Sequence, residues 1–282
     1  MLCREFPFDY LRLGNTATCA PAHRSHLLSV RAQALSRRSE AQELAGSVPI
    51  VVGTVITLTG SQVLFRRQRF EAAIIDEASQ LLEPQALGLL CAQADGCDAI
   101  GKFILIGDHK QLPAVVQQPE TRTATHCDEL LRMGLSDVRH SLFERLHLLE
   151  RQAGRKQFVG MLHRQGRMHP VICQFVNRRF YHGLLQAVPL PHQTEQLPIA
   201  AGRTAFEQFV ATTRMGFFPV ATDSNHENLR ANEPEARVAA RVVEALVSLY
   251  GTQTQTCFQP EQAIGIIVPF RSQIACVRSR LQ

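Results

Sequence analysis

Two short, uninterrupted apolar runs, each ending at an acidic residue, constrain the fold of this 282-residue chain more than any other feature. The runs are FEAAIID (70–76) and KFILIGD (102–108), and the segment between them, 79–94, has the apolar spacing of a helix. Strands that are apolar on both faces and alternate with helices are typical of a parallel sheet covered on both sides. The pattern therefore predicts an α/β fold.

The same alternation extends along the chain and divides it into two parts. In the first part we expect a strand that enters a loop at 49–58, and a helical stretch at 128–150 that is broken near Gly134. A polar joint follows at 151–157. Beyond it we expect strands at 158–162 and 263–270, helices at 169–181 and 235–250, and irregular structure with one strand at 216–222 within 186–234. The predicted units are residues 1–151 and 152–282, each containing a sheet.

The charge of the chain suits a phosphate-bearing partner without requiring one. The formal net charge is +5, and nearly all cations are arginines, since Lys102, Lys110 and Lys156 are the only lysines. Arginine binds phosphate through a planar, two-pronged group of donors. Many basic proteins bind no nucleic acid, so charge alone does not decide between the two possibilities.

Cysteine spacing and apolar run length indicate a protein of the reducing interior of a cell. The eight cysteines are scattered without a Cys-x-x-Cys pair, which favours reduced thiols over a disulfide or zinc framework. The apolar runs are far too short to cross a bilayer, and the N-terminal residues lack the apolar core of a signal peptide. We expect an intracellular protein of bacterial cytoplasmic type with no membrane partner.

The run IIDEASQ (74–80) places two carboxylates, Asp76 and Glu77, directly after a buried strand. One interpretation is helix capping, because acidic residues favour the first turn of a helix such as the one expected from residue 79. The other is that the pair holds a metal ion and a water for phosphate chemistry. The run alone leaves both interpretations open.

Two further segments carry groups suited to phosphate chemistry. In FILIGDHKQLP, Gly107 and Asp108 permit a sharp turn at the carboxyl edge of the sheet, where α/β proteins bind ligands. The amide of Gln111 can contact a phosphate oxygen or orient a water. In QGRMHP, Arg167 lies just before an expected helix start and could reach a phosphate held by the first unit. The alternative is an ordinary surface turn and a solvated arginine.

Taken together, these motifs resemble one family. IIDEASQ (74–80), FILIGDHKQLP (103–113), HSLFERL (140–146), QGRMHPVICQFVNRRFYHGLL (165–185) and IGIIVPFRSQ (264–273) occur in the order seen in superfamily 1 helicases of the Upf1-like branch, the Dna2/Nam7 type. YLRLGN (10–15) and VVGTVITLTG (51–60) are similar to the stretches that precede the acidic motif there. The resemblance covers roughly residues 8–280, and it implies two incomplete RecA-like domains, 1–151 and 152–282.

The resemblance also implies roles for individual residues. Asp76 resembles the residue that holds Mg²⁺ through its water shell, Glu77 the general base, Gln111 the sensor of the γ-phosphate and Arg167 the arginine finger. Gly107, Asp108 and Gln165 would help to bind the nucleotide. Thr57, Thr59, Pro269 and Arg271 resemble residues of the nucleic-acid channel. The implied cofactors are ATP and Mg²⁺, the partner is single-stranded DNA or RNA, and the polarity is 5′ to 3′.

The chain departs from the family pattern at the phosphate-binding loop. The 282 residues contain no Gly-x-x-x-x-Gly-Lys-Ser/Thr, and the two late motifs of the family are also missing. Gly166 replaces the usual tyrosine of the arginine motif. One hypothesis is a truncated piece of an ATP-dependent helicase, with the loop supplied by a separate polypeptide. The other is a non-catalytic RecA-like module that binds nucleic acid or protein. We expect negligible ATPase activity from the isolated chain.

Overall fold

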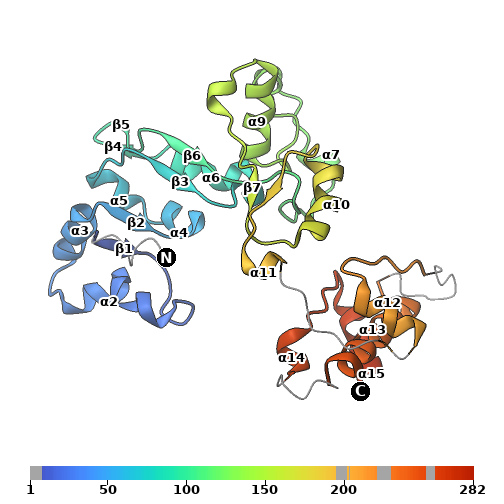
Figure 1. The fold of residues 1–282 in the computed structure, drawn as a ribbon. Helices are drawn as coiled ribbons and strands as arrows, with labels where there is room; N and C mark the ends of the chain where they lie inside the picture. Colours follow the sequence, from blue (N-terminus) through green and yellow to red (C-terminus); the bar gives the residue numbers. More distant parts are fainter. Residues whose placement is uncertain (1–7, 195–201, 203, 221–229, 252–257) are drawn as a thin grey trace. The chain divides into compact units, whose positions relative to one another are not determined.

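The computed structural model describes residues 8–194, 202, 204–220, 230–251 and 258–282. The chain divides into two compact units, Met1–Gly160 and Met161–Gln282 (Figure 1). The division falls a little beyond the expected boundary at residue 151, because the segment that follows the last helix of unit 1 folds back on it.

The described residues of unit 1 form three two-stranded sheets, of which two are parallel. The strands are β1 (Tyr10–Arg12), β2 (Ile50–Val52), β3 (Ala73–Ile75), β4 (Gln93–Ala94), β5 (Cys97–Asp98) and β6 (Phe103–Leu105). β1 pairs with β2 and β3 with β6 in parallel, whereas β4 and β5 form a short antiparallel hairpin. Strands far apart in sequence can pair in parallel only through crossover connections, so the α/β prediction is confirmed.

Helices connect these strands. They are α2 (Leu28–Arg31), α3 (Arg38–Ser47), α4 (Val55–Thr59), α5 (Gln62–Arg67), α6 (Glu83–Leu90), α7 (Glu120–Thr123), α8 (Asp128–Arg132) and α9 (Leu142–Gln152), with 3₁₀ turns η1 (Pro21–His26), η2 (Ala32–Ala34), η3 (Ala78–Gln80) and η4 (Lys156–Phe158). Gly134, with φ 77°, follows α8, which confirms the break expected there. The Ser141 hydroxyl accepts a hydrogen bond from the Glu144 N–H at 3.1 Å and caps α9.

Two apolar clusters hold unit 1 together. Phe65, Leu89 and Ile100 centre the cluster that underlies β3 and β6. Leu11 and Leu64 belong to the cluster beneath β1 and β2. Since α5 contributes a side chain to each cluster, it links the two parallel sheets within one unit.

Unit 2 is mainly helical. It contains β7 (Arg164–Gln165), β8 (Gln186–Ala187), α10 (Pro170–Phe180), α11 (Pro191–Thr194), α12 (Ala205–Thr212), α13 (Glu233–Gly251), α14 (Pro260–Ala263) and α15 (Arg271–Leu281). β7 and β8 pair in parallel, and α13 contacts both α12 and α15. The buried residues of α13 include Ala236, Ala240 and Ala245, whose small side chains permit close helix contact. None of the described helices combines the length and apolar character needed to cross a membrane.

Three expected strands are wrong. Residues 158–162 form no strand: Phe158 ends η4 and Leu162 is 85% exposed. In 263–270, Ile267 is 98% exposed, and 216–220 is likewise without strand structure, while 221–222 lie outside the described residues. A strand needs a neighbour to satisfy its backbone groups, and none of these segments has one among the described residues. The loop expected at the end of 49–58 is instead α4.

Candidate functional site

The carboxyl ends of β3 and β6 bring the two acidic motifs of unit 1 together. Ile75 lies opposite Leu105 in the parallel register. Hydrogen bonding continues beyond the strands, since the Ile106 N–H donates to the Ile75 carbonyl at 2.9 Å and the Ala78 N–H donates to the Ile106 carbonyl at 2.8 Å. The loop that carries Asp76 and Glu77 is therefore fixed against the loop that begins at Gly107.

Ser79 joins these loops, a role that no pattern in the sequence indicates. Its buried hydroxyl accepts a hydrogen bond from the Asp108 N–H at 3.2 Å. Position 107 requires glycine because the two loops approach each other closely there. A Cβ at this position would lie 2.8 Å from the backbone N of Ser79. Ser79 and Gly107 thus set the separation between the acidic pair and Asp108.

The geometry of Asp76 and Glu77 disfavours the capping interpretation. Glu77 precedes η3 and makes no side-chain cap, whereas α6 begins only at Glu83. Glu77 has a left-handed backbone with φ 52° and ψ 35°, which is uncommon for a residue other than glycine. Its N–H donates to Asp76 Oδ1 at 2.9 Å, and both side chains are exposed. Two carboxylates therefore face solvent from a strained turn.

Asp108 stabilises the loop after β6 through hydrogen bonds within the loop. Asp108 Oδ1 accepts from the Lys110 N–H and Asp108 Oδ2 accepts from Gln111 Nε2, both at 3.0 Å. The amide of Gln111 is thus held near the acidic loop by its own motif. Leu112 and Val115, further along, are 85% and 90% exposed.

A histidine pair connects this loop to α9. The rings of His109 and His147 lie 4.7 Å apart between centroids, and the ring of Phe143 stacks parallel to His147 at 6.2 Å. Burial lowers the pKa of both histidines, with the positive charge of Lys110 acting on His109 and the neighbouring ring acting on His147. The contact therefore favours neutral imidazoles.

A nearly buried ion pair joins α9 to the start of α6. Arg145 contacts both carboxylate oxygens of Glu83, at 2.8 and 2.5 Å, and its Nη1 donates to the Met133 carbonyl at 2.8 Å. The two side chains are 11% and 12% exposed. The HSLFERL motif thus fixes the helix that follows the acidic loop.

In unit 2, the loop that carries Arg167 is folded around Gln165. Gln165 Oε1 accepts from the N–H groups of Arg167 (3.0 Å) and Met168 (2.7 Å). Gln193, which is fully buried, donates to the carbonyls of Gln165 and Met168 at 3.2 and 2.9 Å. Gln193 lies in a segment that the sequence indicated only as irregular, so this brace was missed. The exposed side chain of Arg167 projects from a fixed loop.

The residues expected to contact nucleic acid differ in exposure. The Thr59 hydroxyl is buried and has no hydrogen-bond partner among the described residues, and its side chain lies against Gly88 of α6. Thr57 is partly exposed, and its hydroxyl lies 2.8 Å from that of Thr54. Pro269 and Arg271 are exposed at the start of α15. These four roles stay predictions.

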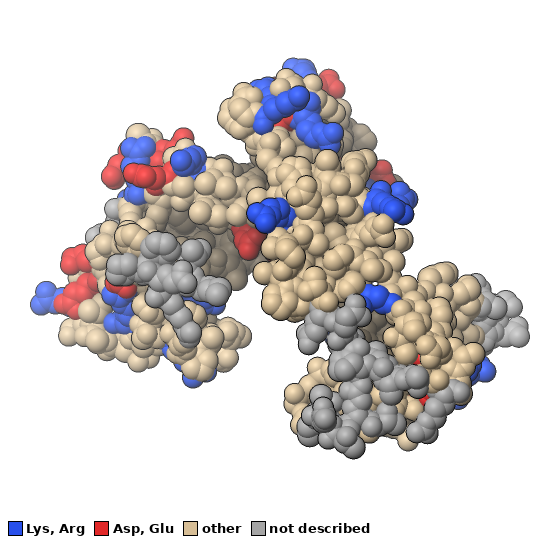
Figure 2. Space-filling model, viewed as in Figure 1, with Lys and Arg blue, Asp and Glu red and all other residues tan. Residues whose placement is uncertain are grey.

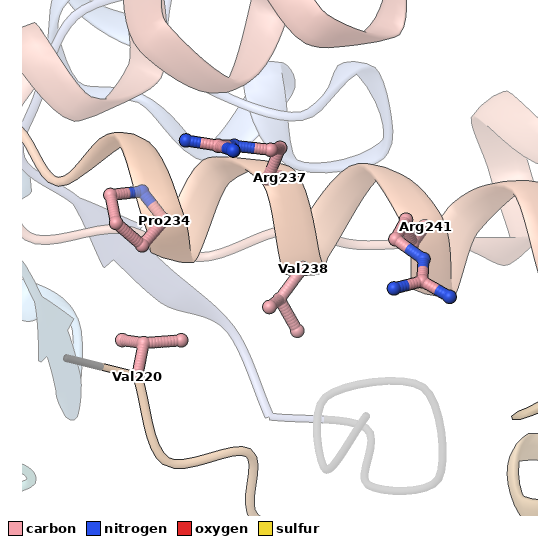
Figure 3. Close-up of a pocket in the computed structure, with 5 residues that line it drawn as sticks. All are labelled: Val220, Pro234, Arg237, Val238 and Arg241. Carbon is pink, nitrogen blue, oxygen red and sulfur yellow. The ribbon is translucent and has the colours of Figure 1, made fainter.

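A separate pocket of about 310 Å³ lies in unit 2 and contains none of the predicted residues. It is lined by Val220, Pro234, Arg237, Val238 and Arg241, and Val238 points from α13 toward Val220 (Figure 3). The Arg241 guanidinium lies 4.8 Å from the centroid of the Phe206 ring. Three of the five lining residues are apolar, and the other two are arginines of α13.

The acidic loop fits Mg²⁺ but not the whole of a nucleoside triphosphate. Within the described part of the chain, no three His, Cys, Asp or Glu side chains form a metal-binding group. Mg²⁺ is commonly held by one or two carboxylates together with waters and substrate phosphates, so Asp76 suffices on the protein side. The one Gly-Lys of the sequence, Gly101–Lys102, precedes β6 at the end opposite Asp108 and cannot cradle phosphates there.

Two family models, each described as an AAA domain, match the chain. They cover residues 20–119 and residues 138–282, and the second match accounts for 145 of the 282 residues. The two matches therefore include both the acidic loop of unit 1 and the arginine loop of unit 2.

Relatives with known names include helicases. The DNA replication ATP-dependent helicase/nuclease DNA2 of Xenopus laevis is 30% identical over an alignment of 292 residues, covering 97% of this chain and 25% of that protein. The human protein of the same name is 32% identical over 184 residues, which cover 64% of this chain and 15% of the human protein. The regulator of nonsense transcripts 1 homolog of Arabidopsis thaliana is 27% identical over 243 residues, which cover 86% of this chain and 16% of that protein.

The chain spans a quarter or less of the length of these relatives. The family matches nevertheless cover both units, and the motifs of the acidic and arginine loops fall inside them. The chain belongs to the superfamily 1 helicases of the Upf1-like branch, whose motor domains are RecA-like.

Proposed function

We propose that the chain carries the metal-and-water side of the ATP site of a helicase that moves 5′ to 3′ along single-stranded DNA or RNA. Asp76 would hold Mg²⁺ through its water shell and Glu77 would orient and deprotonate the attacking water. Gln111 would contact the γ-phosphate, with Gly107 and Asp108 shaping its loop. Bound Mg²⁺ would neutralise charge that develops on the transferred phosphoryl group.

One observation carries this proposal. The hydrogen bonds from β3 to β6 and from Asp108 to Ser79 hold both acidic motifs in fixed register at one sheet edge. Preorganised groups of this kind lower the barrier of phosphoryl transfer because they need no rearrangement during the reaction. In unit 2, a braced loop presents Arg167, a cation of the kind that stabilises phosphoryl-transfer transition states.

A second function is favoured by a different observation. The sequence contains no Gly-x-x-x-x-Gly-Lys-Ser/Thr, so the main cradle for the β- and γ-phosphates is not among these residues. A non-catalytic RecA-like module that binds nucleic acid would need only the basic surface. Both functions predict negligible ATP turnover by the 282-residue chain alone.

ATPase assays with Mg²⁺ and single-stranded DNA or RNA test that expectation. A turnover on the order of ten per second, typical of enzymes, that disappears in Glu77→Gln would show that this chain hydrolyses ATP unaided. No activity in either protein is the expected result. Glu71→Gln, which makes the same change at an exposed position before β3, is the matched control.

The DNA upstream of the Met1 codon separates the two functions. If it encodes an in-frame Gly-x-x-x-x-Gly-Lys-Ser/Thr, the extended chain should hydrolyse ATP, and Glu77→Gln should abolish turnover while nucleotide binding persists. Unwinding of a duplex with a 5′ overhang but not a 3′ overhang would support the polarity. ATP hydrolysis by the extended chain that survives Glu77→Gln would contradict the assigned role.

A further inference from the structure

The first segment of unit 2 is strongly basic. Residues 161–194 contain four arginines and four histidines but no aspartate or glutamate. Arg164, Arg167, Arg178 and Arg179 are all exposed. On the face shown in Figure 2, Lys and Arg atoms form several small groups on the surface. A polyanion would meet no repulsive carboxylate from this segment itself.

Within the part of the chain that the structure describes, the arginines of α10 differ from several other arginines in having no carboxylate partner. Arg31, Arg139 and Arg145 pair with Asp9, Asp137 and Glu83 in unit 1. Among the described residues, no carboxylate pairs with Arg178 or Arg179. Exposed arginines without a carboxylate partner are common and do not by themselves identify a binding site. The side chains beside Arg178 and Arg179 therefore have to supply further evidence.

One face of α10 combines these arginines with an exposed aromatic ring. Cys173 is buried, and the Asn177 side chain is bonded to the backbone of Leu185 at 2.8 and 2.9 Å, which fixes the inward face. Phe175, three and four residues before the arginines, is 54% exposed on the outward side. Residues at this spacing are neighbours on a helix surface.

A second ring ends the same helix. Phe180 is 40% exposed, and the Arg179 guanidinium lies 5.8 Å from its centroid. Exposed apolar side chains are common in this chain, so the rings matter here because they lie beside two arginines. An acidic protein surface would satisfy the arginines alone, whereas a single strand supplies both phosphates and unpaired bases that stack on rings.

We propose that the outward face of α10, formed by Phe175, Arg178 and Arg179, binds single-stranded nucleic acid. Arg178 and Arg179 contact adjacent phosphates, and Phe175 stacks on a base between them. The inference deepens the proposed nucleic-acid function and rests on it, but it is independent of ATP hydrolysis. It therefore holds for the helicase and for the non-catalytic module.

Binding of a fluorescently labelled 20-nucleotide oligothymidylate to the full 282-residue chain tests the proposal, by anisotropy between 50 and 200 mM NaCl. Arg178→Gln/Arg179→Gln should weaken binding roughly tenfold and lower the salt slope by about 1.4, since each single-strand phosphate contact contributes about 0.7. The matched control is Arg66→Gln/Arg132→Gln, which removes the same charge from exposed positions of unit 1. It should leave the slope nearly unchanged.

Variants of Phe175 separate stacking from charge. Phe175→Leu keeps an apolar side chain and should lose roughly 5- to 150-fold in affinity with an unchanged salt slope, as expected for one stacked base. Phe175→Tyr should restore binding. Far-UV circular dichroism verifies that every variant keeps its helix content.

The outcomes distinguish this inference from the proposed function. If the wild-type chain binds the oligonucleotide but the α10 variants match the unit 1 control, the α10 site is wrong while nucleic-acid binding stands. If Phe175→Leu binds normally and polyglutamate competes as well as oligothymidylate, the face is a general anion surface and the proposal fails. If the wild-type chain shows no salt-dependent binding, both are wrong.

Discussion

Replacing Gly107 with alanine should separate the two acidic loops. The added Cβ would lie 2.8 Å from the Ser79 backbone N and 3.3 Å from that of Ala78. Non-bonded carbon needs about 3.5 Å, so one loop must move by roughly 0.7 Å. Overpacking of this kind costs about 1–3 kcal/mol. Loss of the Asp108–Ser79 hydrogen bond adds about 1 kcal/mol, so the free energy of unfolding should fall by about 2–4 kcal/mol.

Urea unfolding followed by far-UV circular dichroism measures this change, because the chain has no tryptophan for fluorescence. With a urea dependence of about 2 kcal/mol per molar, the midpoint should fall by about 1–2 M. Gly46→Ala is the matched control, since nothing lies within 4 Å of its Cβ and it sits in α3. It should leave stability unchanged or raise it by up to about 1 kcal/mol.

A double-mutant cycle with Ser79→Ala tests the mechanism. If Gly107→Ala has already broken the bond from the Asp108 N–H, then Ser79→Ala should cost less in that background than in the wild-type chain. An unchanged midpoint in Gly107→Ala would refute the close contact. Full additivity of the two substitutions would instead show that the clash and the hydrogen bond are independent.

Three other predictions concern charged and titrating groups. Glu83→Gln should destabilise unit 1 by about 3–5 kcal/mol in urea unfolding because it leaves Arg145 buried and unpaired, and Glu83→Gln/Arg145→Met should recover part of the loss. The pKa values of His109 and His147 are lowered in the folded chain, so the stability that their neutral forms contribute is complete above the ordinary pKa of 6.5 and is lost as pH falls below it. The melting temperature should therefore decline between pH 8 and pH 5, and it should decline less in His147→Gln. A hydrogen bond from Arg139 lowers the pKa of Asp137 to about 2. The stability that this carboxylate contributes is therefore present above its usual pKa of 3.8 and is lost as pH falls toward 2. Asp137→Asn should make stability depend less on pH in acid titrations.

The parts of the molecule that the sequence predicted are those that local pattern determines. The apolar runs ending at Asp76 and Asp108 became the parallel pair β3–β6, and Pro170 begins α10 as expected. The expected roles of Asp76, Glu77, Gln111 and Arg167 are not tested by the geometry, although the first three are brought to one sheet edge.

The contacts that fix the site could not be predicted because they join distant residues of ordinary type. Ser79 acts on Asp108 across two strands, and Gln193 supports the Gln165 loop from a segment without periodicity. The same limitation explains the wrong strands. An apolar run such as 263–270 predicts burial, but only a paired neighbour makes it a strand, and pairing is a property of the fold rather than of the run.

The left-handed turn at Glu77 has an energetic consequence for the whole unit. A residue with a Cβ in this conformation is less stable than glycine by about 1 kcal/mol or more. Glycine at position 77 would therefore give a more stable protein with one carboxylate fewer. Folding alone therefore favours glycine over glutamate at this position. Stability measured across substitutions at this position would report that preference directly.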